Sequence, residues 1–400
     1  MKINLNSVEQ LPDDPIFGTT ALFVADPRPH KVNLSIGTYR NEQGLPAVFQ
    51  SVREAEKKIV AANLNKEYLP IEGLASFNQR MSALLFSDSL TAISGDNFFS
   101  AQTPGGTAAL RIAGEFLRRN ISPVIYLPDP TWSNHEQIFS YAGMEIRSYP
   151  YKDPERQLLD FPSILQAIQK MTPNSILLLQ ASCHNPTGID FSPGQWQELS
   201  QLIKQRGLFP LFDAAYQGLG QGIEEDLAAV RQFVHDGHEL IVAASCAKNF
   251  GLYGERVGVL AVVCHGVGAS SRVGSQFKKL IRSSYSNPPL HGARIVSEIL
   301  GSTDLKEAWK NELSFMRERI QTMRALLAAR LYAAGVPQEK AAFSNQNGMF
   351  SLLGLSDNQL LTLREKHALY LAKHGRLNIA GLHAGNIQST VEALAEVMRQ

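Results

Sequence analysis

Residues 245–256 carry a lysine and an arginine on either side of a glycine-containing turn, Lys248 and Arg256. Apolar runs of strand length flank this stretch at 239–244 and 257–263, which predicts a short loop between two buried strands. Burial disfavours an ammonium ion, so it lowers the pKa of a lysine amine and makes the amine nucleophilic toward carbonyl groups. Arginine keeps its charge and suits phosphate. The pair indicates a Schiff-base lysine beside a phosphate anchor, although two surface cations on a solvated loop fit this stretch equally well when it is taken alone.

Three further apolar runs are each followed within a few residues by a side chain that can do chemistry. They are residues 124–127 with Trp132, residues 176–179 with Asn185, and residues 208–212 with Asp213 and Tyr216. Each of these side chains has a structural interpretation as core, turn or helix-cap residue. In parallel sheets, however, ligands bind beyond the carboxyl ends of the strands. The joint occurrence of these four side chains at strand ends therefore favours a single binding site.

A Gly-Gly pair, Gly105 and Gly106, leads through Thr107 into a helix with apolar residues at 110, 112, 113, 116 and 117. Free backbone N–H groups at such a helix start can bind a phosphate, because no side chain blocks the approach. The pair also fits an ordinary turn. Taken with Ser245 and Arg256, it predicts a phosphate site.

The elements that must position these residues alternate along the chain as short apolar strands and helical patterns, which predicts an α/β fold with a mostly parallel sheet covered on both faces. A helix capped by Ser51, with Glu54 three residues on, follows an irregular N-terminal segment that contains one strand at 31–36. A long helix from about Trp309 leads into short strands within 343–355, at 370 and at 376–381. We expect three regions: an N-terminal arm with part of a small domain (1–47), a large cofactor-binding domain (48–310) and a smaller α+β domain (311–400).

The composition bounds the class of protein. The 400 residues are 44% hydrophobic and 19% charged with a formal net charge of +1, which favours neither nucleic acid nor a membrane surface as partner. Cys183, Cys246 and Cys264 form no CxxC pair, and we expect a reducing cytoplasm. The N-terminus has no apolar signal region, and no run approaches the ~18 apolar residues of a membrane span.

A pyridoxal ring at the strand ends would use all these side chains. Asp213 can pair with the pyridine nitrogen, which makes the ring an electron sink. Asn185 and Tyr216 can donate hydrogen bonds to the phenolic oxygen, and Trp132 can stack on the ring. Lys248, once displaced by an amino acid, can carry a proton from the substrate Cα as general base and acid.

Long motifs from residue 14 to residue 382 carry a family resemblance. They are residues 68–74 (YLPIEGL), 184–188 (HNPTG), 212–218 (FDAAYQG), 248–253 (KNFGLY) and 285–289 (YSNPP). In these motifs the chain resembles the class I pyridoxal-phosphate aminotransferases, in particular the aspartate and aromatic aminotransferase subgroup. The resemblance implies fold type I, with a seven-stranded, mostly parallel sheet, and pyridoxal 5'-phosphate bound covalently to Lys248.

The resemblance also implies substrate roles. Arg376 would bind the α-carboxylate, with Asn185, Trp132 and Gly37 nearby. In a homodimer with shared active sites, Tyr68 would reach the partner's cofactor phosphate and Arg282 the partner's substrate side chain. A cation at Arg282 selects a distal carboxylate, so the expected reaction moves the amino group of aspartate or glutamate to a 2-oxo acid such as 2-oxoglutarate. One departure is Gly105, where some family members carry a serine that binds the phosphate.

Other functions stay open. The sequence does not distinguish an aspartate aminotransferase from an aromatic amino acid aminotransferase of the same subgroup. A pyridoxal-dependent lyase or decarboxylase would use the same fold. A transcription regulator related to this fold would need an N-terminal helix-turn-helix domain, and the first fifty residues show no such pattern.

Overall fold

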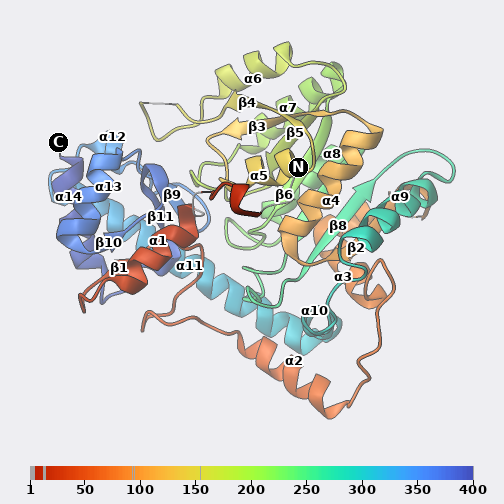
Figure 1. Cartoon of the computed structure of the whole chain (residues 1–400), viewed down its shortest axis with the longest axis horizontal. Coiled ribbons are helices and arrows are strands. Elements are labelled where there is room, and N and C mark those ends of the chain that lie inside the picture. Colours follow the sequence, from red (N-terminus) through yellow and green to blue (C-terminus); the bar gives the residue numbers. More distant parts are fainter. Residues whose placement is uncertain (1–4, 12–14, 92, 94, 154, 400) are drawn as a thin grey trace.

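A seven-stranded sheet forms the centre of the larger part of the molecule (Figure 1). The computed structural model describes residues 5–11, 15–91, 93, 95–153 and 155–399. The strand order is β2-β8-β7-β6-β5-β3-β4, and β8 alone runs antiparallel to its neighbours. The strands are β2 (Phe98–Thr103), β3 (Val124–Asp129), β4 (Glu145–Pro150), β5 (Ile176–Gln180), β6 (Phe209–Ala214), β7 (Leu240–Ser245) and β8 (Gly258–Val263). The predicted α/β fold with a mostly parallel seven-stranded sheet is confirmed.

The central strands are apolar on both faces because each face is covered by helices. On β5, Ile176 and Leu178 join a core with helices α4, α5 and α9, whereas Leu177 and Leu179 join a second core with α6, α7 and α8. The helices around the sheet are α3 (Ala75–Phe86), α4 (Gly105–Asn120), α5 (Asn134–Tyr141), α6 (Phe161–Lys170), α7 (Pro193–Arg206), α8 (Ala228–His235), α9 (Ala269–Ser284) and α10 (His291–Gly301). Burial on both faces explains why these strands are continuously apolar in the sequence.

The two edge strands, β2 and β4, were not among the apolar runs of the sequence. Each pairs with one neighbour only. Most residues of β4 are exposed, and it carries Glu145, Arg147 and Ser148. Edge strands tolerate such polar residues, so an apolar run is no signal for them.

The smaller part of the molecule follows α11 (Thr303–Ala333), which extends from it along the larger part (Figure 1). Its C-terminal elements are β9 (Phe350–Leu352), β10 (Leu369–Tyr370), β11 (Arg376–Asn378), α12 (Gln338–Ala341), α13 (Asp357–His367) and α14 (Ile387–Met398). Short 3-10 turns occur at Leu5–Ser7, Ser87–Thr91, Gly95–Asn97, Glu225–Leu227, Lys373–Gly375 and Ile379–Gly381. The boundaries at residues 47 and 310 stay predictions.

The N-terminal segment packs on this smaller part. Strand β1 (Val32–Asn33) lies within the predicted strand and pairs in parallel with β10. Helix α1 (Pro15–Ala25) was not predicted, because its threonines and glycine are poor helix formers. It is stabilised by tertiary contacts instead: Phe23 packs edge-on against Tyr370, with ring centroids 5.5 Å apart. The prediction that residues 1–50 are irregular is therefore wrong for this helix.

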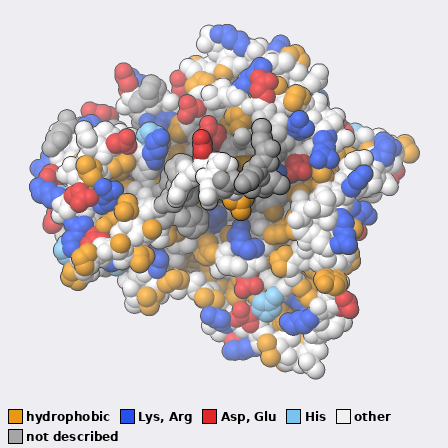
Figure 2. Space-filling model, viewed as in Figure 1, with side chains coloured by type: hydrophobic (Ala, Val, Ile, Leu, Met, Phe, Trp, Pro, Cys, Tyr) orange, Lys and Arg blue, Asp and Glu red, His pale blue; other side chains and the backbone are white. Residues whose placement is uncertain are grey.

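The surface carries both signs of charge. Figure 2 shows acidic and basic side chains interspersed over the visible face, in agreement with a net charge of +1. Among the described residues, every helix is too short or too polar to serve as a membrane span.

Helix α2 (Gln50–Ala61) is capped by a residue from far along the chain. The backbone N–H groups of Gln50 and Ser51 donate to the carboxylate of Glu312 in α11, at 3.1 Å for Ser51. The Ser51 hydroxyl lies inside the first turn without a hydrogen-bond partner among the described residues. The predicted Ser51 cap is therefore wrong, because a carboxylate from α11 satisfies the N–H groups at this helix start.

We expect Glu312→Ala to loosen the first turn of α2. Loss of a cap costs about 1 kcal/mol, so the amides of this turn should exchange with solvent deuterium about fivefold faster. Hydrogen-exchange mass spectrometry of the peptide containing residues 50–61 measures this. Glu318→Ala is the matched control on the exposed side of the same helix, where the carboxylate accepts from Ser314 and from no other residue that the structure describes. Equal exchange rates in the two variants would contradict the capping role.

Candidate active site

The structure brings residues from three strand ends and from the smaller part of the chain into one cluster. The amine of Lys248, after β7, lies 5.1 Å from the ring centre of Tyr216, after β6. Asn185, after β5, donates from Nδ2 to the Tyr216 hydroxyl at 3.2 Å. Arg376, at the start of β11, donates from Nη1 to Asn185 Oδ1 at 3.2 Å. Four residues predicted from distant parts of the sequence therefore meet at the carboxyl ends of parallel strands.

Lys248 has an unusual electrostatic environment. Burial lowers the pKa of its amine to about 8, and the positive charges of Arg256 and Arg376 act in the same direction, while the Asp213 carboxylate opposes them. The side chain is only half-buried, so a small molecule can reach it. An amine with this pKa is neutral in a useful fraction of molecules near neutral pH and can attack a carbonyl carbon.

Asp213 is held at the end of β6 by a histidine that the sequence analysis missed. His135 Nε2 lies 3.1 Å from Asp213 Oδ2, and the hydroxyl of Thr131 lies 2.8 Å from His135 Nδ1. His135 is fully buried, and Trp132 packs edge-on against it with ring centroids 5.2 Å apart. The chain Thr131, His135 and Asp213 orients the carboxylate. In the sequence, the one sign of this chain of contacts is that Thr131 and His135 are four residues apart, with Thr131 just before α5 and His135 in its first turn.

The predicted phosphate cradle is built from the start of α4, the end of β7 and Arg256. Gly105 has a φ of 81°, and a Cβ there would lie 2.7 Å from Arg256 Nη2. A Cβ on Gly106 would lie 3.2 Å from Ser245 Cβ. Thr107 is half-buried in the first turn of the same helix. Glycine at both positions therefore leaves the backbone N–H groups and the guanidinium open to an anion.

Gln180 fixes the backbone of Asn185 and is a second residue that the sequence analysis missed. Its amide accepts from Asn185 N at 2.8 Å and donates to Asn185 O at 2.9 Å. The only signal for Gln180 in the sequence was a polar residue at the end of the buried run 176–179.

The Tyr216 hydroxyl, which accepts from Asn185, is kept in its neutral form. Burial raises the pKa of this hydroxyl, so the phenol stays protonated and can donate a hydrogen bond.

Arg376 is fixed by three groups around its guanidinium. Besides its bond to Asn185, it donates from Nη2 to Ser35 O at 2.7 Å and lies over the ring of Phe350, 4.5 Å from the centroid. A Cβ at Gly37 would lie 2.6 Å from the same ring, so only glycine fits where the N-terminal segment passes this arginine. A rigid, buried guanidinium can bind a carboxylate in a bidentate manner.

Tyr68 and Arg282 lie apart from this cluster. Tyr68 is 83% exposed, and Arg282 is exposed at the end of α9, where it donates to the hydroxyl of Ser286. Their predicted roles in a partner's site stay predictions.

The residues present fit pyridoxal phosphate. A buried carboxylate is available for the ring nitrogen, an amide and a phenol for the phenolic oxygen, a half-buried amine for the aldehyde, and a glycine-lined helix start with an arginine for the phosphate. The donor set thus has one partner for each polar group of the cofactor.

We expect the reactivity of Lys248 in the cofactor-free protein to depend on pH around 8. Only the neutral amine is nucleophilic, so the rate of labelling by an amine-reactive reagent should rise as pH increases through about 8 and level off above it. Mass spectrometry of the peptide containing Lys248 measures this rate. An ordinary lysine has a pKa near ~10.4, so a rate that still rises steeply at higher pH would contradict the depressed pKa.

Known proteins resemble this chain along nearly its whole length. Residues 29–394 match the family described as aminotransferase class I and II. Aspartate aminotransferase of Escherichia coli K12 is 42% identical over 393 residues, which cover 98% of this chain and 99% of the relative. Mitochondrial aspartate aminotransferase of Xenopus tropicalis is 43% identical over 98% of this chain and 92% of its own length.

Two solved structures are similar along nearly the whole chain. Aromatic-amino-acid aminotransferase from Burkholderia pseudomallei, covalently bound to pyridoxal phosphate, superimposes with a TM-score of 0.95 at 42% identity, covering 99% of this chain and all of that one. Aspartate aminotransferase from the cytoplasm of Saccharomyces cerevisiae gives a TM-score of 0.94 at 39% identity, covering 98% of each chain. The chain belongs to the aminotransferase class I and II family.

Proposed function

We propose that this protein is a pyridoxal-phosphate-dependent aspartate aminotransferase, which moves the amino group of aspartate or glutamate to a 2-oxo acid such as 2-oxoglutarate. One observation carries the proposal: the half-buried amine of Lys248, with its pKa lowered to about 8, shares a cluster with the Asp213 carboxylate and the Arg376 guanidinium. The aspartate aminotransferases that match along the whole chain support the substrate. We also propose that the protein acts in the cytoplasm.

The cofactor, when bound, supplies an electron sink for the electrons left on the substrate Cα. Lys248 Nζ would hold the cofactor through its aldehyde. Once a substrate amine replaces it there, the freed amine would act as general base toward the substrate Cα proton and as general acid in returning that proton. A pKa near 8 suits both tasks, because the amine accepts and releases a proton readily near neutral pH.

The surrounding side chains orient the reacting groups. Asp213, held by its contact with His135, would keep the cofactor nitrogen protonated. Asn185 and Tyr216 would donate to the phenolic oxygen, and Trp132 would stack on the ring. The phosphate would be held by Gly105, Gly106, Thr107, Ser245 and Arg256. Arg376 binds the substrate α-carboxylate, with Asn185, Trp132 and Gly37 beside it.

A homodimer completes the proposed site. Tyr68 would contact the cofactor phosphate of the partner subunit, and Arg282 would bind the distal carboxylate of the substrate there. The exposure of both side chains in the single chain supports this assignment, since neither is used within its own site.

An aromatic aminotransferase is the second candidate. The aromatic-amino-acid aminotransferase from Burkholderia pseudomallei matches this chain at the same 42% identity as the Escherichia coli relative. Arg282 is also exposed, and its described hydrogen bond goes to the nearby Ser286 alone, so little holds this side chain in one position.

The visible absorption spectrum of the purified holoenzyme tests the proposal. The cofactor band should disappear when aspartate is added alone and return when 2-oxoglutarate follows. A protein that binds no chromophore after pyridoxal phosphate is supplied would refute the cofactor sites. A chromophore that ignores aspartate but responds to phenylalanine would favour the second candidate.

We expect Arg282→Leu to lower kcat/KM for aspartate far more than for phenylalanine. Loss of a charge pair with the distal carboxylate costs roughly 2–5 kcal/mol, and phenylalanine has no such carboxylate to lose. Steady-state kinetics with both substrates measure the difference. Arg272→Leu is the matched control, because Arg272 is an exposed arginine near the start of the same helix. Equal losses for the two substrates in Arg282→Leu would show that Arg282 is structural.

A further inference from the structure

The loop that carries Asn185 has a backbone that needs outside support. Cys183, two residues before Asn185, has a φ of 54°, which is unfavourable for a residue with a side chain. The turn closes where Gly188 N donates to His184 O at 2.7 Å. The N–H groups of Cys183 and His184 take no part in this turn bond and need acceptors elsewhere.

Asp190 supplies both acceptors. Its Oδ2 accepts from Cys183 N at 2.8 Å, and its Oδ1 accepts from His184 N at 2.9 Å. One carboxylate therefore fixes the two peptide groups directly before Asn185. Together with Gln180, which holds the backbone of Asn185 itself, it determines where the Asn185 amide lies.

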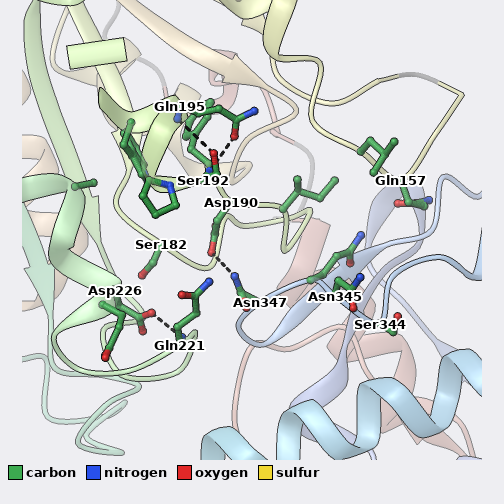
Figure 3. A pocket seen from close by; sticks show the side chains of 18 of the residues that line it. Gln157, Ser182, Asp190, Ser192, Gln195, Gln221, Asp226, Ser344, Asn345 and Asn347 are labelled. Carbon is green, nitrogen blue, oxygen red and sulfur yellow. Dashed lines mark hydrogen bonds between the residues drawn. The ribbon is translucent and has the colours of Figure 1, made fainter. Parts of the chain in front are cut away.

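The same carboxylate is in contact with the smaller part of the molecule. Asn347 donates from Nδ2 to Asp190 Oδ2 at 3.1 Å (Figure 3). The backbone N–H of Asn347 donates to Gly188 O at 2.7 Å. Asn347 precedes β9, whose Phe350 ring lies beneath the guanidinium of Arg376. A single short segment thus contacts both the Asn185 loop and the residue that supports Arg376.

We propose that Asp190 is a positioning residue for Asn185, and that its bond with Asn347 keeps Asn185 in register with Arg376. This inference rests on the proposed function, in which Asn185 donates to the cofactor and lies beside the substrate α-carboxylate. Asp190 touches neither group. It acts by holding a strained loop and by joining that loop to the segment before β9.

The surroundings of this contact should tolerate amino-acid substitutions. Asp190 and Asn347 lie on the wall of a cavity of about 940 Å³ between the two parts of the chain (Figure 3). Both side chains are half-buried. Substitutions there leave no void in the packed core, so folded variants are expected.

Asp190→Asn in the holoenzyme tests the inference. The asparagine amide keeps one acceptor oxygen but presents an NH2 group to the other backbone N–H. We expect the pH midpoint of the cofactor's visible band to rise by about half a unit or more, because Asn185 donates less well to the phenolic oxygen. KM for aspartate should rise about fivefold to tenfold. Asn347→Ala, which removes one donor, should give smaller changes in the same direction.

Asp236→Asn is the matched control. Asp236 is a half-buried carboxylate just after α8 and accepts from the side chains of Ser200 and Gln232 at 2.5 and 2.9 Å, neither of which is a proposed site residue. It should lower the thermal midpoint without moving the pH midpoint of the band. Unchanged band and KM in Asp190→Asn, or equal shifts in Asp236→Asn, would overturn the inference alone. A parent protein without a cofactor band would overturn the proposed function and this inference with it.

Discussion

Lowering the pKa of a lysine amine at the end of a buried strand is the requirement on which the site depends. Burial alone would lower the pKa of Lys248, and two arginines lower it further, but each arginine needs its own support. Asp213 opposes them and keeps the cluster from carrying only positive charge. The sheet solves this problem by geometry, because β5, β6 and β7 are parallel neighbours and deliver Asn185, Asp213 and Lys248 to one edge.

The two arginines reach this edge by different routes. Arg256 follows Lys248 in the same connection between β7 and β8, where the antiparallel turn of β8 brings it back over Gly105. Arg376 comes from β11 in the smaller part and is held by Ser35 O of the N-terminal segment. The N-terminal and C-terminal segments therefore pack together around the second arginine, and β1 pairs with β10 between the same two segments.

Much of this could be predicted from the sequence, because strands buried on both faces are continuously apolar and the polar residues at their ends are conspicuous. The strands β3, β5, β6, β7 and β8 follow such runs. Edge strands lack this pattern, so β2 and β4 could not be located from the sequence, and the family resemblance implied only the number of strands. Residues that only position a site residue also lack a recognisable sequence pattern. His135, Gln180 and Asp190 are ordinary polar residues in the sequence, and their contacts to Asp213 and to the Asn185 loop appear only when the chain is folded. The cap of α2 by Glu312 is non-local for the same reason.

The two proposed substrate arginines differ in how firmly they are held, and this difference bears on specificity. Arg376 is buried, bonded to Ser35 and Asn185, and packed on Phe350. Every amino acid has an α-carboxylate, so a rigid anchor there excludes no amino acid. Arg282 is exposed at a helix end with a neighbouring serine as its described partner. A side chain held so weakly can approach a distal carboxylate or leave room for an aromatic ring at little energetic cost. In the proposed function, relatives named for aspartate and for aromatic amino acids could share one scaffold, since the fixed arginine would bind the α-carboxylate and the movable one would select the side chain.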